Sequence, residues 1–187
     1  MTPVDVRDRQ RPLRDRYTQD PGAAQVELRV RSAPSELTDP LHCAIKPEAA
    51  PGVVWQSGAH AAVGGDDDVP CSTDLLLGAL AACQEVTLRL VAANMGIELE
   101  SLTVTAEADW DARGTLAMGD APIGLKAVRC HTDVIVKDDG KGDRSERLLR
   151  SAEKYCVVLS TLRAGVPVDA TFELRTGAAT GPYLEKP

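Results

Sequence analysis

Several features that would each point to a class of protein are missing from this chain. It has no Cys-x-x-Cys pair, and its five cysteines are an odd number, so a secreted disulfide framework is disfavoured and free thiols in a reducing cytosol fit better. It has no excess of positive charge, since the net charge is -7 and the pI about 5.0, which disfavours nucleic acid and anionic lipid as partners. No charge-free apolar stretch reaches about 18 to 20 residues, and the amino terminus has no apolar leader. We therefore expect a cytoplasmic protein without a membrane segment.

The length and composition predict one domain with an arm and a tail. A chain of 187 residues with 43% hydrophobic residues can bury a single core. Residues 1–22 are rich in arginine interleaved with aspartate, which is typical of a solvated arm, and Pro12 is expected to start a short helix over 12–19. We expect the domain to span 23–175 and the tail 176–187.

The hydrophobic pattern indicates an α+β domain. In residues 25–33, Val26, Leu28 and Val30 alternate with charged side chains, as in a strand with one solvent-exposed face. Helices are predicted over 72–94 and 144–164, and further strands near 41–46, 52–57, 97–111, 123–137 and 166–175. Strands followed by a helix, more strands and a second helix favour helices packed on an antiparallel sheet.

The first predicted helix is apolar nearly all round, which indicates a core helix. Ser72 or Thr73 can cap its amino terminus, Asp74 complements the dipole of its first turn, and Gly96 ends it. For the second helix, Asp143 and Glu146 have the spacing of a capping box, and Gly165 with Pro167 stops it.

Each predicted helix carries a cysteine on a face of apolar and small residues. If the faces of Cys83 and Cys156 meet, the two sulfurs come within disulfide range, which requires Cα atoms about 4.4 to 6.8 Å apart. Taken singly, each cysteine is better explained as inert packing, because free cysteine behaves as a small buried hydrophobe.

Two motifs together resemble a known family. The stretch "DLLLGALAACQEVTLRLVAANMG" and the distant "AEKYCVVLSTLRAGVPVDATFEL" resemble the OsmC/Ohr family of thiol-dependent organic hydroperoxide reductases, and the likeness extends over about residues 24–175. The resemblance implies an OsmC-like fold, in which two central cysteine-bearing helices form the core of an intertwined homodimer with active sites at the subunit interface.

The same resemblance implies a chemistry. Cys83 matches the family's peroxidatic cysteine and Cys156 its resolving cysteine. Attack of the Cys83 thiolate on an organic hydroperoxide would give an alcohol and a sulfenic acid, which Cys156 would convert to a disulfide. No bound cofactor is implied, and an external dithiol or lipoyl-type carrier would reduce that disulfide by exchange.

Attack requires a thiolate, and an apolar setting raises the pKa of a thiol. The dipole of its own helix helps Cys83 little in mid-helix, so we expect a nearby cation. In peroxidases of the family, an amino-terminal arginine held by a glutamate about ten residues before the first cysteine fills this role. Here Thr73 stands at that distance. Asp74 is the nearest acid, and Arg31 is preferred to Arg29 as the cation, although both also fit the wet face of a strand.

Other hypotheses remain open from the sequence. The missing glutamate and the apolar lining around Cys83 also fit a non-catalytic OsmC-like module that binds a lipid-like ligand.

Cys71, just before a helix amino terminus, is either a packed loop cysteine, an accessory thiol or the reactive one. The pairs His42–Cys43 and Cys130–His131 do not predict a metal site, because neighbouring strand residues face opposite ways. The sequence contains no GxSxG motif, so it does not indicate a hydrolase.

Overall fold

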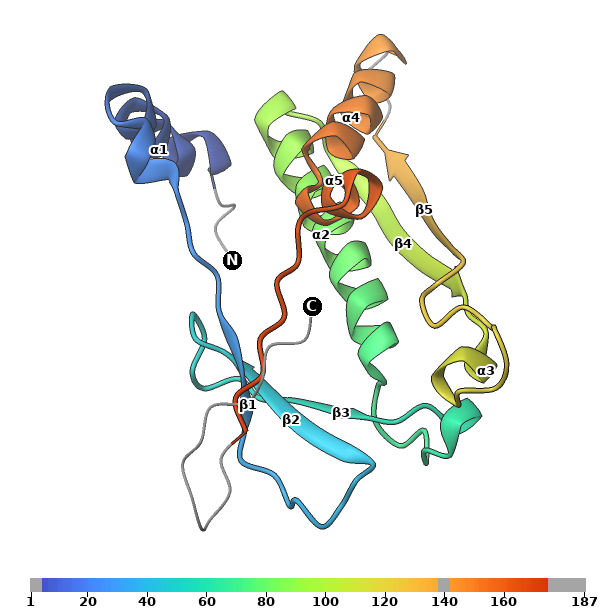
Figure 1. The fold of residues 1–187 in the computed structure, drawn as a ribbon. Coiled ribbons are helices and arrows are strands. Elements are labelled where there is room, and N and C mark those ends of the chain that lie inside the picture. Colours follow the sequence, from blue (N-terminus) through green and yellow to red (C-terminus); the bar gives the residue numbers. More distant parts are fainter. Residues whose placement is uncertain (1–4, 138–141, 175–187) are drawn as a thin grey trace.

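The computed structural model describes residues 5–137 and 142–174 and has the α+β arrangement expected from the sequence (Figure 1). Two antiparallel sheets lie apart in the view, and one long helix runs between them. The first sheet has the order β1-β2-β3, with β1 Val30–Ala33, β2 His42–Pro47 and β3 Trp55–Gly58. The second pairs β4 Leu99–Asp109 with β5 Ala127–Val136.

The long helix α2 spans Ser72–Met95 and packs against β4 and two carboxyl-terminal helices. Its amino-terminal cap is Cys71, which precedes both predicted caps, Ser72 and Thr73. The Asp74 carboxylate accepts a hydrogen bond from the Cys71 backbone N–H at 2.9 Å. Its carboxyl end lies at Gly96, as predicted, where φ is +66°. Glycine adopts this left-handed conformation without the clash that a Cβ atom would cause.

Only one stripe of α2 is buried within the chain. The stripe consists of Leu80, Gln84, Leu88 and Ala92, spaced by four residues and therefore on one face of the helix. Leu88 and Ala92 form the core with Leu148 and Ala152, and the inner face of the β4–β5 pair covers them. Outside this stripe, Leu76, Val86 and Leu90 of α2 are exposed in the described part of the chain.

By length and composition alone, α2 is also long and apolar enough to cross a membrane. Its most apolar window of 18 residues has a mean hydropathy of 1.6, within 24 helical residues. The core helix of a soluble protein has the same properties when its apolar faces are covered. Glu85 and Arg89 pair across one turn of this helix at 2.8 Å.

The amino-terminal helix is longer than predicted. Helix α1 spans Val6–Gln19 with Pro12 inside it, and Asp5 caps it by accepting the Asp8 N–H at 3.0 Å. None of its residues is buried, which agrees with a solvated arm. The arm nevertheless docks on the carboxyl end of α2, where Arg7 Nε donates to the Asn94 carbonyl at 2.9 Å. A short 3-10 helix, η1 Pro21–Ala24, follows.

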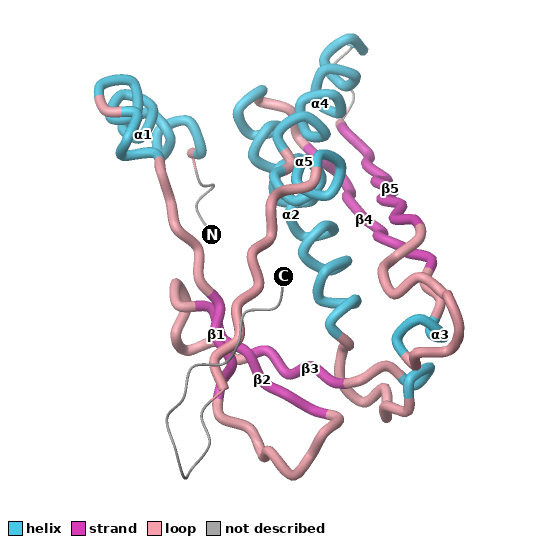
Figure 2. Tube along the Cα trace, in the orientation of Figure 1, coloured by secondary structure: helices cyan, strands magenta, loops and turns pink. Residues whose placement is uncertain are grey.

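Two segments predicted as strands run largely without strand pairing (Figure 2). Strand β1 begins only at Val30, and Val26 and Leu28, expected on its buried face, are 72% and 84% exposed. Residues 166–174 form no strand, and Phe172 among them is 85% exposed, so the prediction of a closing strand is wrong for these residues. Arg175 lies outside the described residues. A period-two pattern becomes a strand only where a neighbouring strand supplies a ladder of hydrogen bonds, and among the described residues no strand is paired with 25–29 or 166–174.

The predicted second helix is two helices. Helix α4 spans Gly142–Tyr155 and α5 spans Val157–Ala164, with Cys156 between them as the amino-terminal cap of α5. Asp143 is thus in the first turn of α4 rather than at its cap. Gly165, with φ +69°, ends α5 as predicted. Between β4 and β5 lies the short helix α3, Ala112–Thr115.

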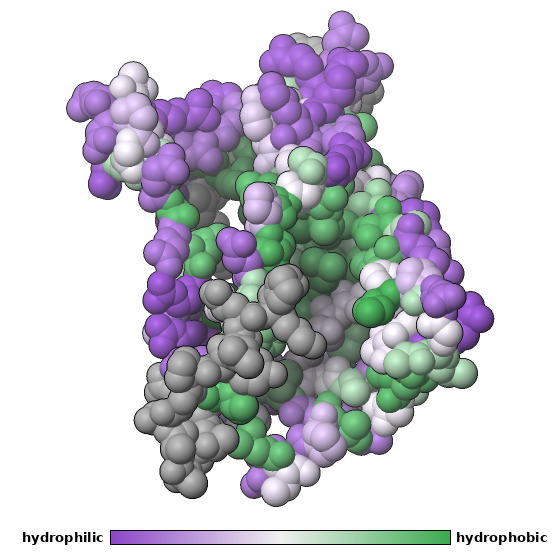
Figure 3. Space-filling view, in the orientation of Figure 1, coloured by the Kyte–Doolittle hydropathy of each residue, from purple (hydrophilic) through white to green (hydrophobic). Residues whose placement is uncertain are grey.

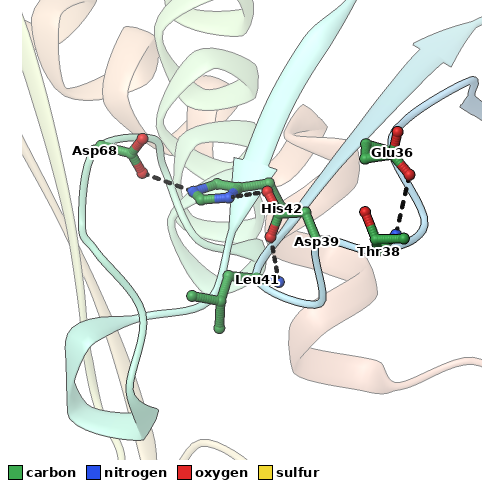
Figure 4. A network of polar contacts seen from close by, with 6 residues as sticks. All are labelled: Glu36, Thr38, Asp39, Leu41, His42 and Asp68. Carbon is green, nitrogen blue, oxygen red and sulfur yellow. Dashed lines mark hydrogen bonds and ion pairs between the residues drawn. The ribbon is translucent and has the colours of Figure 1, made fainter.

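A histidine joins the loops around the first sheet (Figure 4). His42 Nδ1 lies 2.8 Å from Asp39 Oδ2, and His42 Nε2 lies 3.0 Å from Asp68 Oδ1. Hydrogen bonds to Asp39 and Asp68 raise the pKa of His42. The pKa of Asp39 is lowered by the Leu41 N–H and then by His42, and the pKa of Asp68 is lowered by His42. This network connects the start of β2 to the loop that follows the 3-10 helix η2, Ala61–Val63, and leads into α2.

Candidate functional site

The structure brings Cys83 and Cys156 together. Cys83 lies on the fourth turn of α2, and Cys156 lies at the break between α4 and α5. The Cys156 thiol hydrogen-bonds to the Cys83 sulfur. Cys156 has no exposed surface, whereas Cys83 is half-buried, and both are free thiols. The meeting of the two helix faces expected from the sequence is therefore present.

Four groups surround the Cys83 sulfur and offset the effect of burial. Burial raises the pKa of the Cys83 thiol, but the Val158 N–H, the Cys156 thiol, the Thr87 hydroxyl and the Val157 N–H together lower it below the usual value. Each of these groups donates a hydrogen bond that stabilises the thiolate more than the thiol.

Two of the four groups belong to the amino terminus of α5. The first N–H groups of a helix have no partner inside it, and the dipole makes this end favourable for negative charge. Cys83 is in the middle of its own helix but meets the first turn of another. The break at Cys156 therefore makes backbone donors available to Cys83, and the expected side-chain cation stays a prediction.

Cys156 has the opposite tendency. Burial raises the pKa of the Cys156 thiol, the Leu159 N–H partly offsets this, and the neighbouring Cys83 and Cys130 thiols raise it further. The pKa values of the two neighbouring thiols are therefore shifted in opposite directions. A thiol with a lowered pKa suits a nucleophile, and a thiol beside it can attack an oxidised sulfur.

The predicted cation and acid lie elsewhere within the chain. Arg31 on β1 pairs with Glu48, and Arg29 pairs with Glu27. Asp74 is nine residues before Cys83, which places it about 13.5 Å away along the axis and half a turn around α2. In the described part of the chain, no hydrogen bond or ion pair joins Arg31 or Asp74 to Cys83, so their roles stay predictions.

Sequence reasoning missed the donors on α5. Thr87 was visible as a hydroxyl one turn beyond Cys83 on the same helix face. Val157 and Val158 carried no signal, because their contribution comes from backbone N–H groups that every residue other than proline has.

The other three cysteines, Cys43, Cys71 and Cys130, are not part of this pair. Cys71 is buried and caps α2, Cys43 on β2 is exposed, and Cys130 on β5 is half-buried with a pKa raised by burial. Over residues 5–137 and 142–174, no group of three or more His, Cys, Asp or Glu side chains is placed to hold a metal ion.

Comparison with known proteins agrees with this arrangement. The family model described as OsmC-like protein matches residues 65–171, more than half of the chain and both cysteines of the pair. No curated protein sequence matches the chain significantly.

Solved structures of low identity share the fold. An OsmC-like protein from Mycoplasma pneumoniae is 14% identical, with a TM-score of 0.58 over 75% of this chain and 90% of that one. An organic hydroperoxide resistance protein from Elizabethkingia anophelis is 17% identical, with a TM-score of 0.56 over 76% and 91%. An OsmC-like protein of unknown function from Vibrio cholerae is 12% identical, with a TM-score of 0.59 over 73% and 94%. By its sequence match and its fold, this chain belongs to the OsmC-like protein family.

Proposed function

We propose that this protein is a cytoplasmic, thiol-dependent peroxidase that reduces organic hydroperoxides to alcohols. The observation that carries the proposal is the Cys83 thiol, whose pKa is lowered by the Val158 N–H and the Cys156 thiol against the effect of burial. A lowered pKa suits a nucleophile, whereas the alternative, a non-catalytic module binding a lipid-like ligand, needs no ionised thiol.

The proposed reaction has three steps. The Cys83 thiolate attacks the terminal peroxide oxygen, the O–O bond breaks, and the alkoxide takes a proton to leave as an alcohol. The Cys156 thiol then attacks the Cys83 sulfenic acid, forming a disulfide and releasing water. An external dithiol or lipoyl-type carrier exchanges with this disulfide and restores both thiols while it is itself oxidised.

The proposal includes a homodimer. The face of α2 that carries Cys83 also carries Leu76 and Leu90, each seven residues away and each 39% exposed, and Val86 nearby is 54% exposed. Apolar side chains gathered on one helix face favour coverage by another surface. A second copy of the chain would cover this face and bring its own amino-terminal arginines near, which is where Arg31 would act on Cys83.

Disulfide mapping tests the proposal directly. Reduced protein is mixed with one equivalent of cumene hydroperoxide, alkylated and digested, and the disulfides are identified by mass spectrometry. We expect the Cys83–Cys156 disulfide and one equivalent of alcohol, followed by catalytic peroxide consumption when a dithiol is added. Absence of both the disulfide and peroxide consumption would rule out the proposed reaction.

A further inference from the structure

A groove lies between α2, β5 and the two carboxyl-terminal helices. Its volume is about 610 Å³, and α2 contributes Leu80, Gln84 and Leu88 to its walls. Leu149 of α4 and Leu162 of α5 line the same groove with exposed side chains. Apolar side chains are seen on the recessed surface between α2 and the β4–β5 pair (Figure 3). Sites for small organic molecules are mostly apolar and measure roughly 300 to 1,000 Å³, so the groove has a suitable size and lining.

Gln84 is the polar residue that α2 contributes to this groove. It is 7% exposed, and its Oε1 has no hydrogen-bond partner among the described residues. A buried acceptor without a donor is unfavourable, and such a group in a folded protein calls for a partner. The terminal torsion of a glutamine side chain is broad, so the carboxamide can turn Oε1 toward a donor in the groove. The groove therefore offers one unpaired acceptor between apolar side chains.

The charged side chains that line the groove have acidic neighbours within the chain. Arg163 Nη1 of α5 pairs with Glu153 Oε1 of α4 at 2.8 Å. The Lys126 N–H donates to the Asp109 carbonyl at 2.8 Å, so this lysine lies beside an acidic residue of β4. An anionic ligand would compete with Glu153 for Arg163, and a cationic ligand would meet two cations against one carboxylate. Because burying an unpaired charge is costly, the groove suits an uncharged ligand.

We propose that this groove is a binding site for an uncharged, apolar alcohol whose hydroxyl donates a hydrogen bond to Gln84 Oε1. The apolar body of the alcohol lies along α2 between Leu80 and Leu88, which are about 12 Å apart along the helix axis. A hydroxyl suits this position because the same oxygen can also accept, and the Thr132 hydroxyl in the wall of the groove is a donor.

The alcohol site is separate from the thiol pair. Neither Cys83 nor Cys156 is among the described residues that line the groove. Gln84 follows Cys83 in the sequence and is therefore turned about 100° from it around α2. The inference goes beyond the proposed peroxidase and does not depend on it, because alcohol binding requires no reaction at Cys83.

Calorimetric titration of the full chain with two isomeric probes tests the site. The probes are n-octanol and heptyl methyl ether, which have the same atoms but differ in the O–H donor. We expect the wild type to bind n-octanol about fivefold more tightly than the ether, as one hydrogen bond to Gln84 predicts. Gln84→Met should remove this preference. Gln56→Met, which makes the same change at an exposed position of β3, should keep it.

NMR spectra of labelled leucine methyl groups locate the bound probe. We expect n-octanol to shift the signals of Leu149 and Leu162 and to leave those of Leu76 and Leu90 unchanged. Shifts at Leu76 and Leu90 alone would place the binding on another face of α2 and overturn the proposal. Equal affinities of the wild type for both probes, or a preference that survives Gln84→Met, would also overturn it. Absence of n-octanol binding would do the same, and would indicate that protein fills the groove, for example a second copy of the chain.

Discussion

The Cys83 sulfur meets the backbone N–H of Val158, in the first turn of a helix other than its own. A thiol placed in the middle of a 24-residue helix thereby receives the electrostatic benefit of a helix amino terminus. The break between α4 and α5 at Cys156 makes these donors available, so Cys156 and the backbone groups that lower the pKa of Cys83 occupy the same turn.

Removing one backbone donor should raise the pKa of Cys83. Val157→Pro suits the first position of α5, because proline is favoured there and Cys156 before it is already extended. We expect the pH profile of Cys83 alkylation to move upward. Val157→Ala, which keeps the N–H and loses a side chain that is 71% exposed, should keep the wild-type profile. Equal profiles in the two variants would show that the Val157 N–H does not act on Cys83.

Replacing the resolving thiol should trap the oxidised intermediate. Cys156→Ser keeps a good helix cap but cannot form a disulfide, so Cys83 should accumulate as a sulfenic acid that a dimedone probe labels. Cys83→Ser should lose peroxide reduction altogether.

Cys71 also lies at a helix cap, and the Cys71→Ser variant should remain fully active. An inactive Cys71→Ser variant would instead identify Cys71 as the reactive thiol.

A charge on the exposed face of α2 should prevent self-association. We expect Val86→Glu to shift the protein from dimer to monomer in analytical ultracentrifugation, because burying an unpaired carboxylate costs several kcal/mol. Leu37→Glu adds the same charge at a site that is 92% exposed and should leave the dimer intact. A Val86→Glu variant that sediments as the wild type would place the interface elsewhere.

The His42 network should make stability depend on pH. The folded pKa of His42 is raised above its unfolded value, so its contribution is fully present below the unfolded pKa and is lost as pH rises through the folded pKa. Asp39 and Asp68 have lowered folded pKa values, so their contributions are present above their unfolded values and lost as pH falls. Urea unfolding should show His42→Gln less stable than the wild type near pH 5.5, with the difference shrinking by pH 9. A constant difference would contradict the assignment.

Gln84 should lower the free energy of unfolding. It is buried, and its Oε1 has no hydrogen-bond partner among the described residues. Gln84→Met keeps the length of the side chain and removes the unpaired acceptor, so we expect the free energy of unfolding to rise by about 1 kcal/mol. Gln84→Glu should lower it, because a carboxylate is costlier to bury. A stability loss in the methionine variant would show that Oε1 is paired in solution, for example by the second copy of the chain.

Much of the fold could be predicted because local signals agreed. The run of apolar residues before Gly96 defined α2 almost to the residue, and alternation of β-branched residues defined β4 and β5. The strands expected over 25–33 and 166–175 had the same alternation. Their pairing depends on partners elsewhere, which alternation does not specify.

The sequence by itself determined the two cysteines, the helix that carries Cys83 and the family to which the chain belongs. Only the tertiary structure decided which groups lower the pKa of Cys83, because this depends on where the helix that contains Lys154 is interrupted and on which backbone N–H groups then have no partner inside a helix. Residues 144–164 read as one continuous helix, since every side chain there tolerates helix. The interruption at Cys156 is a backbone property with no side-chain signature, and its effect arises only when α5 is packed against α2.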